Sequence, residues 1–245
     1  MAMTEALFRE DAYLREAEAK VLGINERGGV LLDRTIFYAT SGGQPGDTGR
    51  IVRANGEVVD IAGTITGETK DEIIHLPAPG QPGLEPGEAV ALGIDWERRH
   101  RLMRMHTACH LLTVICPYPI TGAAVSEEDS RVDFDLPDAG FTKEEVTARL
   151  QELIAADHPV STRWIGDEEL AANPSLVKSK NVRPPMGSGR IRLVLIGENG
   201  NVDSQPSGGT HVRSTGEIGE IHVGKIEKKG RENRRFRLRF GPLPA

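Results

Sequence analysis

The 245-residue chain carries a formal net charge of −6, with 38% hydrophobic and 27% charged residues, which is ordinary for a water-soluble globular protein of one large or two modest domains. No uncharged apolar run approaches the length of a membrane span, so we expect a cytoplasmic protein without a membrane partner. The acidic balance excludes a protein that wraps nucleic acid over its whole surface; we expect no DNA partner, and any RNA contact must be a local basic patch.

The first ninety or so residues read as short strands separated by turns. A segment rich in proline and glycine, residues 77–83, is too rich in breakers for regular structure. Strand-like stretches lie on both sides of it, at 13–14, 19–24, 29–32, 49–53, 57–63, 72–76 and 88–94. We therefore predict a small β-barrel domain over residues 1–94.

A glycine-rich stretch, residues 35–49, interrupts these strands. Its glycines and Pro45 exclude the interior of a helix, so it must be a loop. The loop is either a shaped segment whose bare backbone approaches a ligand closely or an ordinary connection of several turns.

A helix is predicted from Trp96 to about Ile115, with Asp95 as its N-terminal cap and Pro117 after its end. Its first half is basic. Such a cluster is either a solvated face or a sign of an anionic partner, because cations in the opening turns oppose the helix dipole. The basic residues are Arg98, Arg99, His100, Arg101 and Arg104.

Two histidines of this helix, His106 and His110, are four positions apart, so their imidazoles lie on one face and can converge on a metal ion. They sit at the edge of an apolar stripe and are expected to look into a cleft. A second pair, Ser207 and His211, is also four apart and lies about a hundred residues later. Together the pairs offer three or four ligands, the number that zinc requires. The apolar stripe consists of Leu102, Met105, Cys109 and Leu112.

The remainder reads as an α+β domain over residues 95–245. An amphipathic helix is predicted for 143–156, with a capping box formed by Thr142 and Glu145. A hairpin is predicted to pair 217–227 with 234–240 across a basic tip. Further strands at 131–136, 160–165 and 190–197 and a short helix at 167–172 complete the pattern.

Taken together, these motifs resemble those of the free-standing alanyl-tRNA editing proteins called AlaX and of the editing domain of alanyl-tRNA synthetase. The resemblance follows the family order through the glycine-rich loop, the histidine-bearing helix, the segment around Ser207 and His211, and the basic segment at 225–235. The long N-terminal region resembles the medium-length AlaX class. That class implies a small β-barrel followed by an α+β editing domain of the alanyl/threonyl-tRNA synthetase type.

The resemblance implies a zinc-dependent deacylase that hydrolyses the ester joining serine or glycine to the 3′ end of alanine tRNA. His106, His110 and His211 would be the zinc ligands and part of the catalytic centre. The family usually has a cysteine where this chain has Ser207, a weak ligand at best. The zinc would therefore have three histidine ligands, or a water in the fourth position.

Two further sets of residues are candidates for contacts with the tRNA substrate. Thr40 and Gln44 of the glycine-rich loop are expected to hydrogen-bond the serine hydroxyl. The alternative is that they are simply polar residues of a loop, without a role in binding. Basic residues near the hairpin tip are expected to contact tRNA phosphates, unless the tip is only solvated. These residues are Lys225, Lys228, Lys229, Arg231, Arg234 and Arg235.

Three alternatives compete with this interpretation. A zinc peptidase would need a glutamate directly after the first histidine, where this chain has Thr107. The editing domain of threonyl-tRNA synthetase, which clears serine from threonine tRNA, shares the paired histidines, although the glycine-rich loop favours the alanine system. An RNA-binding module of the same fold that has lost its metal is the third alternative.

Overall fold

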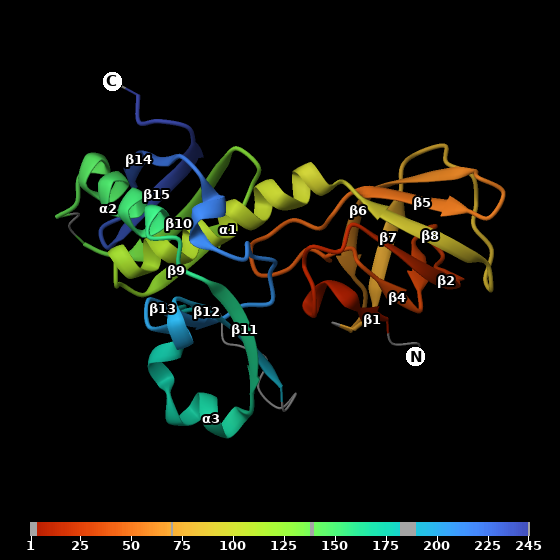
Figure 1. Cartoon of the computed structure of the whole chain (residues 1–245), viewed down its shortest axis with the longest axis horizontal. Helices are drawn as coiled ribbons and strands as arrows, with labels where there is room; N and C mark the ends of the chain where they lie inside the picture. Colours follow the sequence, from red (N-terminus) through yellow and green to blue (C-terminus); the bar gives the residue numbers. More distant parts are fainter. Residues whose placement is uncertain (1–3, 70, 138–139, 182–189, 245) are drawn as a thin grey trace. The chain divides into compact units, whose positions relative to one another are not determined.

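The computed structural model describes residues 4–69, 71–137, 140–181 and 190–244. It divides into two compact units, Met1–Arg101 and Leu102–Ala245, which we describe separately (Figure 1). Helix α1, Trp96–Ile115, begins in the first unit and ends in the second. The boundary expected after residue 94 lies just before this helix, whereas the compact units divide within it.

The first unit is a closed barrel of antiparallel strands. Closure pairs the edge of β2 with β8, so the barrel presents no free sheet edge. Inward-facing residues such as Val21, Ile51 and Val59 fill the interior. The predicted barrel is therefore confirmed. In spatial order the strands are β2 (Glu16–Ile24), β3 (Val30–Leu32), β7 (Ile73–Pro77), β6 (Val58–Thr66), β5 (Gly49–Arg53) and β8 (Ala89–Ile94).

The chain before β2 differs from the expectation. A two-residue strand β1, Glu5–Ala6, pairs in parallel with β4, Arg34–Thr35, and a 3-10 turn η1 follows at Leu7–Arg9. The strand predicted at 13–14 is wrong: Tyr13 lies in a turn, where its backbone N–H donates to the Asp11 carboxylate at 2.9 Å. A short-range side-chain hydrogen bond of this kind favours a turn over a strand.

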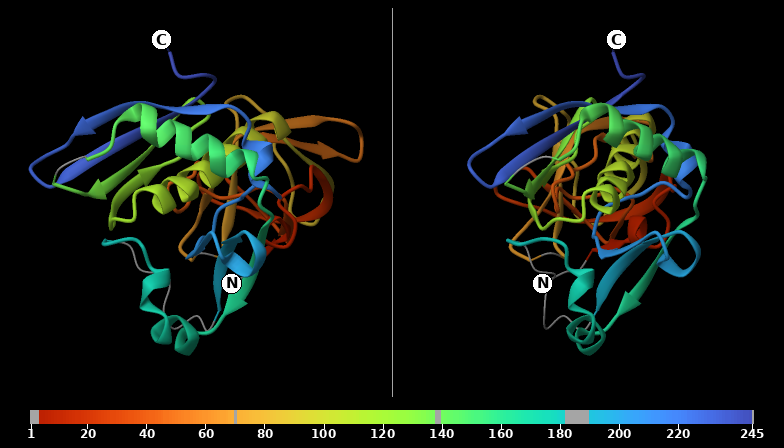
Figure 2. Two further views of the ribbon diagram at one scale, coloured as in Figure 1. Left: turned by 60° about the vertical axis from the view of Figure 1, so that its left-hand side comes forward. Right: turned by 90° about the vertical axis from the view of Figure 1, so that its left-hand side faces the viewer.

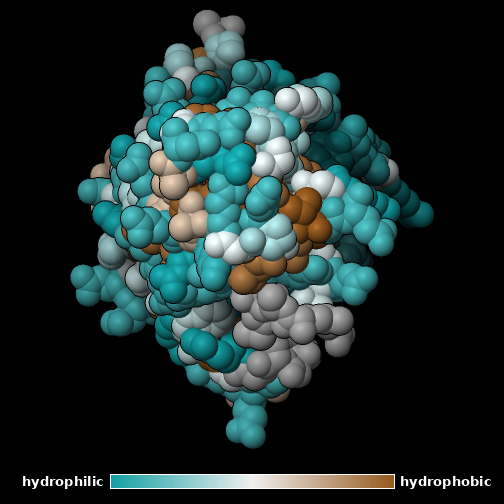
Figure 3. Space-filling model, turned by 90° about the vertical axis from the view of Figure 1, so that its right-hand side faces the viewer, coloured by the Kyte–Doolittle hydropathy of each residue, from teal (hydrophilic) through white to brown (hydrophobic). Residues whose placement is uncertain are grey.

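The outward-facing residues of the described barrel strands are a mixture of charged and apolar side chains. The face in Figure 3 is largely hydrophilic, with apolar side chains in small separate patches. Leu22, Ile24, Val58 and Ile65 are the exposed large apolar side chains among the described barrel strands. Scattered exposure of this kind is common on soluble domains and marks no binding surface.

The second unit contains two antiparallel sheets, which establishes the α+β class. The larger sheet has the order β14 (Ile221–Lys228), β15 (Asn233–Phe240), β10 (Asp129–Asp135) and β9 (Ile120–Ala124). The smaller has the order β11 (Val160–Ile165), β12 (Ile191–Ile196) and β13 (Asp203–Pro206). The predicted hairpin is β14 with β15, although its first strand begins only at Ile221 because the 3-10 turn η4, Thr215–Ile218, precedes it.

Helices cover both sheets. Helix α2, Lys143–Ala155, lies along β14 (Figure 2), where the backbone N–H of Val223 donates to Thr147 Oγ1 at 3.0 Å. Helix α3, Asp167–Ala172, and the 3-10 turn η2, Pro174–Leu176, cover the smaller sheet through a core centred on Leu170. A further 3-10 turn, η3, spans Glu198–Gly200.

Both predicted helix caps are confirmed. Thr142 and Glu145 form a reciprocal capping box on α2, and Asp95 Oδ1 accepts from the backbone N–H of Arg98 at 3.1 Å at the start of α1. These bonds satisfy N–H groups that the first helical turn leaves without partners. Among the residues described, none of the helices is both long and apolar enough to cross a bilayer.

Helix α1 is more deeply buried than its apolar stripe suggests. From Leu102 to Cys116 only Arg104 and Val114 are partly exposed. His106 and His110, which were expected at the edge of the stripe, are therefore buried as well. Arg104 shows how the polar groups are accommodated: its Nε donates to the Ile218 carbonyl at 2.8 Å, and its guanidinium lies 4.3 Å from the centroid of the Phe240 ring.

Arg99, in the basic first half of α1, also has a structural role. Its side chain is fully buried and pairs with the carboxylate of Asp47. Its Nη1 donates to the Ala12 carbonyl at 2.8 Å and its Nη2 to the Ile36 carbonyl at 2.6 Å. The sequence suggested that this basic cluster is either a solvated face or a contact for an anionic partner. Arg99 and Arg104 are neither, because both bind groups within the protein.

Candidate metal centre

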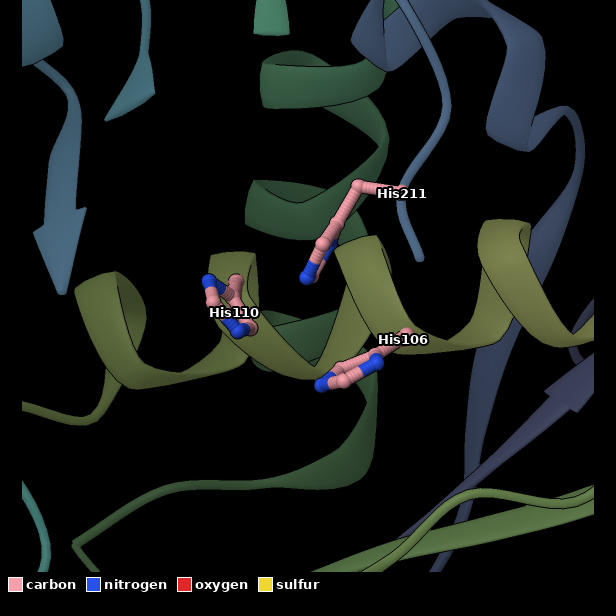
Figure 4. A group of neighbouring side chains, drawn as sticks. All are labelled: His106, His110 and His211. Atoms are coloured by element: carbon pink, nitrogen blue, oxygen red, sulfur yellow. The ribbon is translucent and has the colours of Figure 1, made fainter. Parts of the chain in front are cut away.

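His106, His110 and His211 converge in the second unit. Figure 4 shows the first two on α1 and His211 reaching toward them from the loop after β13. Each offers a nitrogen that lies within 4.8 Å of the nitrogens of the other two. The ring centroids are 4.3 Å apart for His106 and His211, 4.5 Å for His110 and His211, and 5.2 Å for His106 and His110. All three side chains are buried, so the cluster expected from the sequence exists.

The loop that carries His211 is held by the neighbouring strand and helix. Arg192 of β12 donates through Nη1 to the carbonyls of Ser207 at 3.1 Å and Gly209 at 2.9 Å. The backbone N–H of Val212 donates to Thr107 Oγ1 on α1 at 3.3 Å. The glycine-containing loop is therefore fixed on both sides of His211.

The surroundings favour neutral imidazoles. Burial, followed by the charges of His110 and Arg192, lowers the pKa of His106 well below its ordinary value. The pKa of His211 is lowered in the same direction by burial, and then by His106, His110 and Arg192. Because a metal binds imidazole only in its neutral form, these environments prepare the side chains for coordination.

A hydrogen-bond argument assigns the tautomer of His211. The Thr107 hydroxyl donates its single hydrogen to the Met103 carbonyl at 3.0 Å. Nδ1 of His211 lies 3.2 Å from the same Oγ1 and must therefore be the donor in that contact. Nε2 of His211 is left with its lone pair available, as a metal ligand requires.

Ser207 lies beside this available nitrogen. Its Oγ is 3.1 Å from Nε2 of His211 and accepts from the Gly209 N–H at 3.3 Å. A neutral hydroxyl is a far weaker zinc ligand than a thiolate. Among the described residues, the group of potential metal ligands consists of the three histidines and includes neither Cys109 nor Cys116. Both thiols are buried, which raises the pKa of each to about 12.

Asp203, a residue that sequence reasoning did not assign to the site, lies behind His110. Oδ2 of its carboxylate is 3.4 Å from His110 Nδ1, and its Oδ1 pairs with the ammonium of Lys178. The burial of Asp203 would raise its pKa, but His110 and Lys178 outweigh this and lower it to about 2. The signal in the sequence was weak, because β13 reads Asp-Ser-Gln-Pro and was not predicted as a strand.

Three imidazoles with a buried carboxylate behind one of them fit a divalent transition metal such as zinc. With a hydroxyl in place of a thiolate, such a site would offer the ion three strong protein ligands. That pattern is typical of catalytic rather than structural zinc.

The glycine-rich loop, with Thr40 and Gln44, lies in the first unit. Gly42 and Gly43 have positive φ angles of 55° and 83° and form a two-residue turn closed by Ser41 and Gln44. A Cβ on Gly46 would lie 1.9 Å from the Thr64 carbonyl, so the barrel's own backbone requires that glycine.

The two loop residues predicted to contact substrate differ in accessibility. Thr40 is exposed; its hydroxyl donates to the Thr64 carbonyl at 3.2 Å and accepts from the Gly46 N–H at 2.8 Å. Gln44 is fully buried. The three histidines lie in the other compact unit.

The six basic residues predicted for tRNA binding lie on or beside the hairpin of β14 and β15, in two different environments. Arg234 is buried and donates to the Pro137 carbonyl, and Arg235 forms two hydrogen bonds with Asp133 at 2.7 and 2.9 Å. These two arginines stabilise the sheet. The exposed members of the set are Lys225, Lys228, Lys229 and Arg231.

Two family models match the chain. Residues 4–98 match the model described as tRNA synthetases class II (A). Residues 191–237, which include β12, β13, Ser207 and His211, match the threonyl and alanyl tRNA synthetase second additional domain.

Individual relatives extend the similarity over nearly the whole chain. It is 39% identical to the alanyl-tRNA editing protein AlaX-M of Methanosarcina mazei, over 96% of this chain and 95% of that protein. It is 35% identical to AlaX-M of Saccharolobus solfataricus, over 95% and 97% of the two chains. The alanine–tRNA ligase of Pyrobaculum arsenaticum is 38% identical over 92% of this chain but only 25% of the ligase. By this full-length similarity, the chain belongs to the AlaX-M family of alanyl-tRNA editing proteins.

Proposed function

We propose that the protein hydrolyses the ester that joins serine or glycine to the 3′ end of alanine tRNA. Family membership supports alanyl-tRNA editing. The observation that carries the chemistry is the buried cluster of His106, His110 and His211. Editing is needed because a pocket that accepts alanine cannot exclude glycine by size and rejects an added hydroxyl poorly.

The three histidines are the proposed zinc ligands, with Ser207 as a weak neighbour. A bound zinc would supply Lewis acidity, which polarises a carbonyl or lowers the pKa of a water. The protein itself keeps two imidazoles neutral by burial and orients His211 through Thr107. The Ser207 hydroxyl, 3.1 Å from His211 Nε2, is placed to hydrogen-bond a water or a substrate group at that position.

Discrimination of serine from alanine is proposed to depend on Thr40. Its hydroxyl already donates to Thr64 and accepts from Gly46, which leaves one lone pair to accept from a serine hydroxyl. An alanine side chain has no hydroxyl to donate and gains nothing there. Gln44 remains the second candidate of the loop; its side chain is buried, and its backbone closes the turn with Ser41.

The tRNA is proposed to contact the exposed basic residues of the hairpin. Lys228, Lys229 and Arg231 lie at its tip, and Lys225 lies on β14. Such contacts position the tRNA without reading its sequence. Arg234 and Arg235 are assigned a supporting role, because their guanidinium groups bind neighbouring backbone and Asp133.

The direct test is deacylation of seryl-, glycyl- and alanyl-tRNA of the alanine isoacceptor, with seryl-tRNA of the threonine isoacceptor as a comparison. We expect hydrolysis of the seryl or glycyl alanine-tRNA, or of both, and sparing of the alanyl form. Equal rates on seryl- and alanyl-tRNA would contradict the proposal. Preference for the threonine isoacceptor would identify the threonyl-type activity instead.

A second candidate function is an RNA-binding module without metal, because Ser207 stands where the family has a cysteine ligand. That module would bind alanine tRNA and hydrolyse none of the four esters, even with zinc added. Tight binding without hydrolysis would therefore favour the module over the enzyme.

A further inference from the structure

Asp203 is the first residue of β13, and its side chain is completely buried within 4 Å of one candidate metal ligand. His110 Nδ1 is itself buried and has no hydrogen-bond partner with good geometry among the described residues. The carboxylate oxygen Oδ2 of Asp203, at 3.4 Å, lies at the limit of a hydrogen bond. Each group is therefore placed to satisfy the other.

The carboxylate is held by groups other than the histidine. The Lys178 ammonium pairs with Oδ1 and also donates to Thr113 Oγ1 at 2.9 Å. The Gln205 amide donates from Nε2 to Oδ2 at 2.7 Å. Oδ2 thus accepts from Gln205 and retains capacity to accept from His110 as well. These partners fix the carboxylate in the position that faces the imidazole.

An ionised carboxylate only accepts hydrogen bonds, so its contact with His110 is favourable when Nδ1 carries the hydrogen. Nε2 then keeps its lone pair. This is the same tautomer that Thr107 imposes on His211. His211 and His110 are thereby favoured in the same Nδ1–H tautomer, the first by Thr107 of α1 and the second by Asp203 of β13.

We propose that Asp203 is a positioning residue of the metal centre, which holds His110 in the Nδ1–H tautomer with Nε2 free to bind the ion. This inference rests on the metal site in the proposed function. A carboxylate behind a histidine ligand fixes the ring and raises its basicity, and its loss commonly weakens metal binding about 10- to 100-fold. With a serine in place of the family thiolate, Asp203 also supplies a buried negative charge beside one of the three histidines, His110.

The tautomer is measurable in the unaltered protein. The full chain is labelled with 15N, stripped of metal, and examined by long-range proton–nitrogen NMR, with the His110 signals assigned by comparison with His110→Gln. We expect a protonated Nδ1 and an unprotonated Nε2. A protonated Nε2 on His110 would overturn the proposal, and this result does not depend on any variant of Asp203 folding.

The effect on metal binding is measured with Asp203→Asn, which keeps the side-chain size and removes the charge. We expect the zinc dissociation constant, from chelator competition, to rise about 10- to 100-fold. The visible absorption bands of Co²⁺ at saturation should also shift. Asp133→Asn is the matched control, because Asp133 is likewise buried and paired with a cation, Arg235, in the same unit. Its zinc affinity and cobalt spectrum should equal those of the wild type.

The outcomes separate this inference from the function on which it rests. A wild type that binds neither zinc nor cobalt would contradict the proposed metal site itself. A wild type that binds zinc, with Asp203→Asn unchanged in affinity and cobalt spectrum, would overturn only the role of Asp203. Loss of affinity in Asp203→Asn, with Asp133→Asn unaffected, would support both.

Discussion

The guanidinium of Arg99 and the carboxylate of Asp47 form a fully buried ion pair that fixes the glycine-rich loop to the first turn of α1. Nε of Arg99 is 3.0 Å from each carboxylate oxygen, and Oδ2 also accepts from the Tyr38 N–H at 2.6 Å. The backbone of Asp47 is held as well, since its carbonyl accepts from Thr64 Oγ1 at 3.0 Å. The buried charge pair is therefore one of several contacts that fix the conformation of the loop.

Removal of one partner of this pair should strongly destabilise the protein. In Asp47→Asn the guanidinium stays buried without a compensating charge, which commonly costs about 3–5 kcal/mol of unfolding free energy. Urea denaturation, followed through the unfolding transition of the first unit, measures this loss of unfolding free energy. Glu57→Gln, which breaks the exposed pair of Arg53 and Glu57 in the same barrel, should change stability little. Equal stability of the two variants would show that the Arg99 pair does not hold the loop.

Local sequence signals predicted much of this fold because they act within a few residues. The capping box of Thr142 and Glu145 and the bounds of α1 follow from short-range hydrogen bonding and prolines. Strand β13 escaped prediction because its inward residues are polar and are stabilised by Lys178 and by each other. The formation of β13 therefore depends on tertiary contacts and not on a local sequence pattern.

The same distinction explains the candidate site. The spacing of His106 and His110 on a helix predicted their proximity. The spacing of Ser207 and His211 made His211 a candidate ligand, and the resemblance to the AlaX family supported it. The contact of Asp203 with His110, and that of Arg99 with Asp47, join residues far apart in the sequence. No periodic pattern encodes such pairs, so a basic run on α1 could not be separated into structural and exposed arginines before the structure was known.

Thr107 should influence metal affinity through His211. Thr107→Val keeps the shape of the side chain and removes the oxygen that accepts from His211 Nδ1. We expect zinc affinity, by chelator competition, to fall by about 10-fold or more because the tautomer is no longer fixed. Thr147→Val is the control: Thr147 is also a buried threonine of this unit, but its hydroxyl accepts from Val223. An equal loss of affinity in both variants would indicate a general effect of threonine removal rather than an effect on His211.

The hairpin tip should bind tRNA electrostatically. A triple variant, Lys228→Ala with Lys229→Ala and Arg231→Ala, should weaken tRNA binding and reduce the slope of log affinity against log salt by about one for each phosphate that is no longer neutralised. The choice between serine and alanine should not change. Filter binding over a range of salt concentrations gives the slope. As a charge-matched control, the same measurement is made on Lys20→Ala with Arg27→Ala and Arg50→Ala, which are exposed basic residues of the barrel unit and not of the hairpin. Unchanged affinity in the hairpin variant would mean that the tip is only solvated.

Restoring the family thiolate should strengthen metal binding. In Ser207→Cys a sulfur replaces the hydroxyl that lies beside His211 Nε2, and thiolate is a much better zinc ligand. We expect the variant to retain zinc through dialysis against a chelator concentration that strips the wild type. Ser204→Cys, on the same strand-and-loop segment, is the control for adding a thiol. Equal zinc loss from Ser207→Cys and the wild type would place position 207 outside the coordination sphere.

Zinc dependence of seryl-tRNA deacylation, measured together with metal content by mass spectrometry on the same samples, tests the central claim most directly. The samples are the wild type as purified, the wild type after chelation, the chelated protein with zinc restored, and His211→Ala. We predict that activity follows zinc content, is lost on chelation, returns with added zinc, and is absent from His211→Ala together with the metal. Full activity in the chelated wild type, or full zinc occupancy in His211→Ala, would contradict a deacylase built on these three histidines.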